Sequence, residues 1–399
     1  MPQDASSEER PVILVIVGAN PTVARAAATL PCDLVHLQLP GAPELDPETA
    51  ATSTVLTVDF RDPLAFFPFV DEFIRPLSPA AIVSLTEFGM EPAAVAAERL
   101  GVRGVAPEVV RATRDKLEMR VALERTAPQL NPLFASGDDP AAVSRLFAGN
   151  AAVVAKPVDG GGSMDVILLE HLADLPEERR SAATLLEQFA GGLEFSVEAL
   201  SVDGKHTFVG IAEKGTTDGF VEVSHVMPPP SLDSRRQRLV EQAVGELLDA
   251  VGLTDGPSHT EVKVDGDKVV IIETHTRLGG DGIADLVQLT SGVEWRRAAL
   301  GWAIDAGLRR QPVTAAAAAT VFITAPPGRV TSVSPQPVLT HGSIVQWDVT
   351  VEPGDEVPPL RSSFDRSGMG ILTAPSAAEC AAAVAEFAGF TIVTTQTAD

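Results

Sequence analysis

The sequence has no tyrosine and only two cysteines, Cys32 and Cys380, among its 399 residues. Two cysteines are too few for the disulfide framework of a small secreted domain, which favours a reducing cytosol. The longest apolar run, around residues 315–325, is shorter than the roughly 20 residues of a membrane-spanning helix. The first ten residues are polar and acidic and do not resemble a signal peptide. We therefore expect a soluble, cytoplasmic protein with no membrane partner.

Basic residues are also scarce. The chain has 30 Lys and Arg against 54 Asp and Glu, a formal net charge of −24. Such a charge repels nucleic-acid backbones and anionic lipid surfaces, so nucleic acid is not an expected partner. A small anionic ligand such as ATP remains compatible with it, because a local site needs only two or three cations.

The first hundred residues alternate strand-like and helical segments, which predicts a doubly wound parallel α/β sheet. The apolar segments that indicate buried strands are 11–18, 33–37, 54–58 and 80–85. Polar residues that follow such strands, including Glu87, lie where open α/β sheets place ligands.

Later segments have a different character. A charged helix is predicted over 107–124, and strands that form hairpins dominate from residue 151. We expect an N-terminal α/β domain over 1–106, and a linker helix with a small subdomain over 107–192. A large, mainly antiparallel subdomain should occupy 193–399, with a distinct C-terminal portion from about 320. The fold class is α/β, with an α+β second part.

The strongest chemical signal is the end of an apolar strand, where Glu273, His275 and Arg277 alternate. Period two places all three on one face. Glu261 lies on the preceding strand, and an odd connection, such as the three residues 265–267, would put Glu261 and Glu273 on the same side. Two adjacent carboxylates favour a hard divalent cation such as Mg²⁺. The alternative is a solvated hairpin with charged residues on its wet face, which the apolar run before Glu273 disfavours.

A second signal is Lys156 at the end of an apolar strand, followed by the glycine loop Gly160, Gly161, Gly162 and Ser163. Glycines let backbone N–H groups approach phosphate oxygens, and the lysine supplies a point charge. The loop is not a Walker A sequence. Taken alone, it could equally be a glycine-rich hairpin turn.

A third segment carries acids on two expected strands, at Glu187 and Glu194, which we expect to meet at a Gly191-Gly192 turn. Alone it is an ordinary hairpin, and its value lies in its position between the lysine–glycine loop and the glutamate pair.

These pieces occur in the order typical of the ATP-grasp superfamily, which the chain resembles over nearly its whole length. The resemblance implies an N-terminal α/β domain, a small lid and a large catalytic subdomain. It implies magnesium ligands at Glu261 and Glu273, with Mn²⁺ as a substitute, and an intermediate-stabilising arginine at Arg277. In the usual pattern an asparagine stands where this chain has His275, so His275 is an uncertain third ligand. The implied ATP-binding residues are Lys116, Lys156, Gly160, Gly161, Gly162, Ser163, Glu187, Phe189, Ala190 and Glu194.

Within the superfamily the chain most resembles L-amino-acid ligases and other carboxylate–amine ligases. The phrases around Arg277-Leu-Gly-Gly-Asp281, Glu222-Val-Ser-His225 and Ser367-Gly-Met-Gly carry this resemblance. It implies that the substrate pocket is bordered by Glu222, His225, Gly279 and Gly280, together with Glu87. A homodimer through the N-terminal region is also implied.

The expected reaction converts a carboxylate to an acyl phosphate with ATP, and an amine then displaces phosphate to form an amide, with an amino acid as one substrate. Two alternatives remain open: a bicarbonate-activating ATP-grasp carboxylase, and a non-catalytic ATP-binding protein with a degenerate site. His275 is the residue that points to the last of these.

Overall fold

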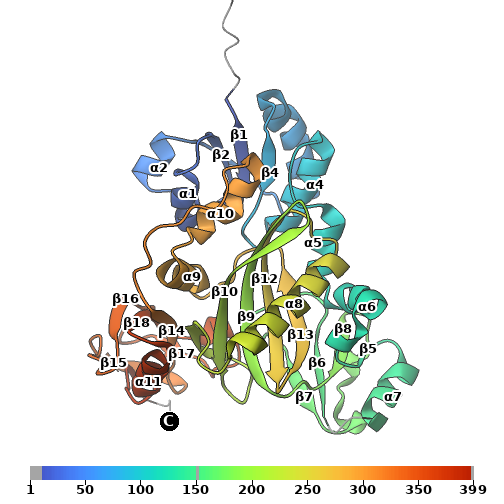
Figure 1. Ribbon diagram of the computed structural model, residues 1–399, viewed down its shortest axis with the longest axis vertical. Helices are drawn as coiled ribbons and strands as arrows, with labels where there is room; N and C mark the ends of the chain where they lie inside the picture. The colour runs from blue at the N-terminus through green and yellow to red at the C-terminus, as the bar shows by residue number, and fades with distance from the viewer. Residues whose placement is uncertain (1–10, 150–151, 397–399) are drawn as a thin grey trace, which may run out of the picture. The chain divides into compact units, whose positions relative to one another are not determined.

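The computed structural model describes residues 11–149 and 152–396 and divides into two compact units (Figure 1). The first unit contains the chain up to Val110 together with Arg296–Arg309, and the second contains Arg111–Trp295 and the chain from Arg310. The sequence did not indicate that a later segment returns to the first unit. The division into three parts, 1–106, 107–192 and 193–399, stays a prediction.

The first unit is built on a parallel sheet, as predicted. Its strands lie in the order β3-β2-β1-β4, and every pair is parallel. The apolar faces of this sheet pack against helices α3 and α4 in one buried cluster that includes Val15, Phe66 and Ala97. The elements are β1 (Ile13–Val17), α1 (Pro21–Ala27), β2 (Asp33–Gln38), α2 (Pro47–Ala51), β3 (Thr54–Thr57), α3 (Pro63–Phe69), β4 (Ala81–Val83) and α4 (Met90–Leu100).

The charged segment 107–124 is two helices rather than one, α5 (Pro107–Arg114) and α6 (Lys116–Thr126). Asp115 separates them, because its carboxylate accepts hydrogen bonds from the backbone N–H groups of Leu117 and Glu118 at 2.8 and 3.0 Å. This is N-cap geometry, which begins a new helix. Lys116 is therefore the first residue of α6.

The first sheet of the second unit is a four-stranded antiparallel sheet of order β5-β8-β6-β7. Its apolar face packs with helix α7 in a small core of its own, which includes Val143, Leu146 and Leu186. The elements are β5 (Phe134–Ser136), α7 (Pro140–Gly149), β6 (Val153–Pro157), β7 (Ile167–Leu169) and β8 (Thr184–Gln188).

An eight-stranded antiparallel sheet of order β13-β12-β9-β10-β11-β14-β18-β16 forms the rest of the framework (Figure 1). The long helix α8 (Ser234–Ala250) packs against β12 and β13. The strands are β9 (Leu193–Val202), β10 (Lys205–Thr216), β11 (Glu222–Met227), β12 (Gly256–Asp265), β13 (Lys268–His275), β14 (Ala317–Ile323), β16 (Ser343–Val349) and β18 (Gly368–Ala374).

The last part of the chain adds a three-stranded sheet of order β17-β15-β19 and helix α11 (Ala377–Phe387). Its strands are β15 (Gly328–Val333), β17 (Glu356–Val357) and β19 (Val393–Gln396). Within the described ranges, none of the helices has the length and apolar character needed to cross a bilayer.

The Gly191-Gly192 segment is not the turn of a hairpin, contrary to the sequence-based expectation. Strand β8 pairs with β5 and β6, whereas β9 pairs with β10 and β12, so these glycines connect two different sheets. Gly192 has φ +91°, and a Cβ there would lie 2.3 Å from the carbonyl oxygen of Val264. Glycine is therefore required where the chain leaves the small sheet and enters the large one.

Candidate active site

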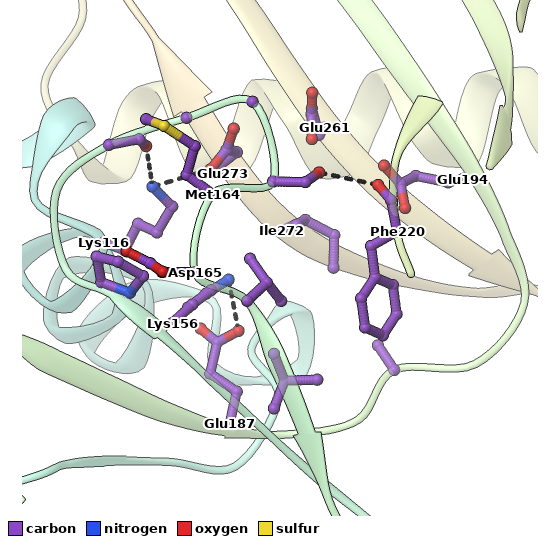
Figure 2. Close-up of a pocket in the computed structure, with 18 of the residues that line it drawn as sticks. Lys116, Lys156, Met164, Asp165, Glu187, Glu194, Phe220, Glu261, Ile272 and Glu273 are labelled. Carbon is purple, nitrogen blue, oxygen red and sulfur yellow. Dashed lines mark hydrogen bonds and ion pairs between the residues drawn. The ribbon is translucent and has the colours of Figure 1, made fainter. Parts of the chain in front are cut away.

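A cavity of about 300 Å³ lies in the second unit between the small sheet and the large sheet (Figure 2). All ten residues predicted to bind ATP line it, and so do Glu261, Glu273 and Glu222. These residues come from segments spread over more than 150 positions, from Lys116 to Glu273. Folding therefore brings the three sequence signals to one place.

Lys156 lies at the end of strand β6 and is almost fully buried. Its Nζ is 2.7 Å from the Glu187 carboxylate on β8, an ion pair marked in Figure 2. Burial lowers the pKa of Lys156, and the neighbouring cations Arg120 and Lys116 act in the same direction, while Glu187 opposes them. The lysine is thus a desolvated cation at the wall of the cavity.

Glu187 has a second cationic partner that the sequence analysis missed. Arg120 of α6 is fully buried and donates from Nε to Glu187 at 2.5 Å. Burial raises the pKa of Glu187, but Arg120 and Lys156 outweigh this and hold the pKa below its usual range. Glu187 is therefore an ionised carboxylate between two cations.

Lys116 connects the glycine loop to the glutamate pair. From the start of α6, its Nζ donates to the carbonyl oxygen of Gly160 at 2.6 Å and lies 3.0 Å from Glu273 Oε2 (Figure 2). The pKa of Glu273 lies well below its usual value: burial raises it, but Lys116 above all, then His275 and Lys156, lower it.

Glu261 and Glu273 lie directly opposite each other on β12 and β13, but not for the predicted reason. Asp265 pairs with Lys268, so the connection has two residues rather than an odd number. A regular hairpin with that turn would send the two glutamates to opposite faces. Instead the register shifts between Val262 and Glu261, and Ile272 is an extra residue without a partner on β12. A β-bulge therefore produces the pairing.

The bulge also explains why Ile272 and Glu273, adjacent in sequence, both line the cavity. Successive side chains of a regular strand point to opposite faces. At a bulge two residues face one residue of the partner strand, so an apolar side chain and a carboxylate can reach the same side.

Lys214 of strand β10 is the centre of the other charged cluster. Its Nζ lies 2.8 Å from Glu194, 2.8 Å from Glu261 and 3.1 Å from Glu222. Burial opposes the charge of this lysine, but the three carboxylates raise its pKa well above the usual value. The sequence analysis missed Lys214; its only signal was a basic residue shortly after the apolar residues 209–212.

A buried network supports Glu261 from behind. Glu198, fully buried on β9, accepts hydrogen bonds from Trp295 Nε1 at 3.0 Å and the Gly279 N–H at 3.1 Å, and it pairs with Nδ1 of His259. His259 Nε2 is 3.4 Å from Glu261. Although burial disfavours the imidazolium, Glu198 raises the pKa of His259 to about 9.

The same surroundings act on Glu261 itself. Burial raises its pKa, but Lys214 outweighs this, and the pKa of Glu261 is lowered to about 2. Both members of the glutamate pair are thus ionised at neutral pH, each with a lysine as its counter-charge.

The glycine loop contacts the C-terminal part of the chain. Ser363 donates its backbone N–H to the Gly162 carbonyl at 3.3 Å and its hydroxyl to Glu222 at 2.6 Å. Ser163 donates its hydroxyl to the Phe220 carbonyl at 2.8 Å. The loop is therefore tied to two segments that lie more than 50 residues away in sequence.

Several predicted site residues do not line the cavity. His275 is buried, with Nε2 3.4 Å from Glu273, and Arg277 lies in the bend after β13, where Nη1 donates to the Leu278 carbonyl at 2.8 Å. His225 is buried with Nε2 3.7 Å from Asp281. Glu87 belongs to the first unit, so its part in a site stays a prediction.

The loop that contains Gly279 and Gly280 continues to Asp281, which forms a bidentate ion pair with Arg366 at 2.7 and 3.0 Å. A Cβ on Gly279 would lie 2.8 Å from both Glu198 and His259. Gly279 is therefore needed for packing against that network, and neither glycine lines the cavity.

Metal-binding geometry is partly present. No cluster of three or more His, Cys, Asp or Glu suited to a metal ion is found within residues 11–149 and 152–396. The glutamate pair supplies two carboxylates, which matches the one or two protein ligands that magnesium takes when phosphates complete its coordination.

Comparisons with known families identify the domain. Residues 150–285 match the ATP-grasp domain model. The chain contains an ATP-grasp domain. Residues 321–395 match a second model, L-amino acid ligase C-terminal domain 2. The ATP-grasp match includes both the glycine loop and the glutamate pair.

Among solved structures, an L-amino acid ligase from Bacillus licheniformis superposes with a TM-score of 0.79 at 21% identity, covering 98% of this chain and 100% of that one. A phosphoribosylglycinamide synthetase from Anaerococcus prevotii gives 0.71 at 16% identity, with 96% and 100% covered. At these identities the likeness establishes the ATP-grasp fold, as predicted from the sequence.

Among curated proteins, an alanine–anticapsin ligase of Bacillus subtilis is 25% identical over 261 residues, which is 56% of this chain and 54% of the relative. The chain thus spans about half the length of the curated relative that it matches.

Proposed function

We propose that this protein is an ATP-dependent carboxylate–amine ligase that forms an amide or peptide bond, with an amino acid as one substrate. The observation that carries the proposal is the cavity in which Lys116, Lys156 and the glycine loop meet Glu261 and Glu273. The ATP-grasp match and the L-amino acid ligase match in the C-terminal part support it.

In the proposed reaction, a carboxylate oxygen of the acid attacks the γ-phosphorus of ATP, and ADP leaves. The amine then attacks the acyl carbon, phosphate leaves, and the amine loses a proton. Most of the work is positioning and charge neutralisation, so no nucleophilic side chain is required.

Lys116 and Lys156 would neutralise the phosphate oxygens. Both are buried, so their charges are weakly screened and act strongly at short range. Glu187, Phe189 and Ala190 would border adenine, and Glu194 the ribose. Because two cations hold Glu187 in place, its carboxylate would accept a hydrogen bond from the adenine amino group in a defined orientation.

Glu261 and Glu273 would hold Mg²⁺, or Mn²⁺ in its place, which supplies charge neutralisation to the transferring phosphoryl group. Their lysine partners already keep both carboxylates ionised, the form in which they bind a cation. His275 would join them only through a water or a small movement, since its Nε2 lies 3.4 Å from the Glu273 carboxylate.

The glycine loop would exclude water from the acyl phosphate. Its contacts with Ser363 and Phe220 hold it over the cavity, which protects a hydrolysable intermediate. Glu222, His225, Gly279 and Gly280 would border the acid or the amine.

Arg277 would stabilise the developing oxyanion and the leaving phosphate, after its side chain leaves the Leu278 carbonyl. Arg277→Ala tests this role, because amide formation at the wild-type rate would exclude it.

The activity itself is tested by mass spectrometry of products from mixed amino acids, ATP and Mg²⁺, with ADP release measured with and without bicarbonate. Amide products with ADP release independent of bicarbonate are expected. ADP release that requires bicarbonate would establish the carboxylase instead, and ATP binding without ADP release would establish a non-catalytic protein. The C-terminal ligase match favours amide formation.

A further inference from the structure

Arg120 joins three elements of the second unit. It lies on helix α6 and is completely buried. Its Nε donates to Glu187 on β8 at 2.5 Å, and its Nη2 donates to the backbone carbonyl of Ile272 on β13 at 2.8 Å. One guanidinium thus contacts the small sheet and the edge strand of the large sheet.

The hydrogen bond from Arg120 to the Ile272 carbonyl bears on the glutamate pair, because Ile272 is the extra residue of the β13 bulge. An extra residue has no partner across the ladder, so its backbone groups need other hydrogen bonds. The Ile272 carbonyl is partly buried where Arg120 reaches it, and a desolvated carbonyl without a donor is costly. Arg120 supplies that donor, and a charged one, which makes a stronger hydrogen bond than a neutral group.

The bulge in turn decides where Glu273 points. With the two-residue turn at Gly266-Asp267, the regular register would pair Glu261 with Ile272 and turn Glu273 to the other face. The bulge brings Glu273 opposite Glu261 instead. Whatever stabilises the bulge therefore controls the geometry of the carboxylate pair.

We propose that Arg120 is a positioning residue: it holds the Ile272 bulge, and so the opposition of Glu261 and Glu273, while the same guanidinium fixes Glu187. The inference rests on the proposed nucleotide site. Arg120 couples the two halves of that site, because the group that orients Glu187 also sets the carboxylates for the metal. It does not line the cavity itself.

The planar guanidinium is suited to this task. Its donors point in fixed, divergent directions, so that it reaches a carboxylate and a carbonyl on different strands at once. A lysine carries one compact ammonium group and would satisfy Glu187 but not both partners. Arg120→Lys therefore separates the two contacts, and Arg120→Met removes both.

The test measures ATP affinity by titration calorimetry, first with EDTA and then with saturating Mg²⁺, for wild type, Arg120→Met and Arg120→Lys. Arg125→Met is the matched control, since Arg125 is an exposed arginine of the same helix. The ratio of the two affinities reports the metal contribution, independently of catalysis.

We expect Arg120→Met to reduce that ratio at least tenfold and to weaken metal-free binding as well. Arg120→Lys should restore metal-free affinity to within threefold of wild type but leave the ratio at least tenfold reduced. Arg125→Met should change neither. A purely structural role would lower thermal stability and leave the ratio unchanged.

A wild-type ratio in either Arg120→Met or Arg120→Lys would overturn the proposal. If Arg120→Met does not fold, Arg120→Lys alone decides. A wild-type protein that binds ATP with a metal contribution but makes no amide would overturn the ligase function and leave this test intact.

Discussion

The two sides of the cavity bury charge in opposite proportions. On one side a single carboxylate, Glu187, lies between Arg120 and Lys156. On the other, the Lys214 ammonium group lies among three carboxylates, and Lys263 adds a more distant cation 3.7 Å from Glu194. Buried charge is costly unless it is paired, so an excess of charge of one sign indicates that a ligand group of the opposite sign binds there. The cation-rich side suits phosphate, and the acid-rich side suits a metal ion or an amine.

Lys116 lies between these two sides and contacts residues of both. It contacts both the glycine loop and Glu273, so it is a cation placed at the margin of the acidic pair. A nucleotide with its metal would satisfy both surpluses together, because it brings anionic phosphates and a divalent cation in one ligand.

The acid-rich side should fail most severely when its cation is removed. Lys214→Met leaves three buried carboxylates with reduced compensation, and we expect the free energy of unfolding to fall by roughly 3–5 kcal/mol. Urea unfolding measures this change. Millimolar Mg²⁺ should restore part of the lost stability in the variant and have little effect on wild type. Equal stabilisation of both proteins would contradict an excess of negative charge on the acid-rich side.

On the cation-rich side, Lys156→Met should damage function more than folding. Arg120 still neutralises Glu187, so the fold should persist. The loss of one charge from the phosphate region should slow ADP release roughly 10²- to 10³-fold. Enzyme kinetics measures the effect on ADP release, and thermal unfolding followed by circular dichroism measures the effect on stability. A loss of stability as large as that of Lys214→Met would show that the two sides of the cavity do not differ in this way.

The pH dependence of stability should report His259. Its pKa is raised to about 9 from 6.5, so its contribution is complete below pH 6.5 and is lost as pH rises through 9. The free energy of unfolding should fall by on the order of 3 kcal/mol over that range, at about 1.36 kcal/mol per pKa unit. His259→Gln should flatten this part of the profile measured in EDTA, and an unchanged slope would exclude His259 as the cause.

The smallest effect concerns the tie between the glycine loop and the C-terminal segment. Ser363→Ala removes the hydroxyl that donates to Glu222 but keeps the backbone contact with Gly162. Stability should fall by about 1 kcal/mol. Single-turnover experiments should show more ATP hydrolysis relative to amide formation, and an unchanged ratio of hydrolysis to amide formation would exclude a role for this contact.

Much of the candidate site was predictable, partly from residues at strand ends and in the glycine loop and partly, as for Lys116 and Phe189, from the resemblance to the ATP-grasp superfamily. The alternation of apolar and charged residues marked Glu261 and Glu273, and the apolar strand before Lys156 marked the second lysine. The parallel sheet of the first unit followed from continuous apolar segments in the same way. Helix α6 was harder, since only the cap at Asp115 separates it from α5.

What the sequence by itself determined is the set of chemical groups and their order along the chain, because strand periodicity and glycine loops are local properties. Only the tertiary structure decided how those groups pair. The donor that Arg120 brings to Ile272 and the ion pair between Lys214 and Glu261 depend on residues that lie 152 and 47 positions apart, and the bulge at Ile272 depends on a one-residue shift in register. A hairpin pattern read from sequence assumes a regular ladder, and it is the departure from that ladder that sets Glu261 opposite Glu273.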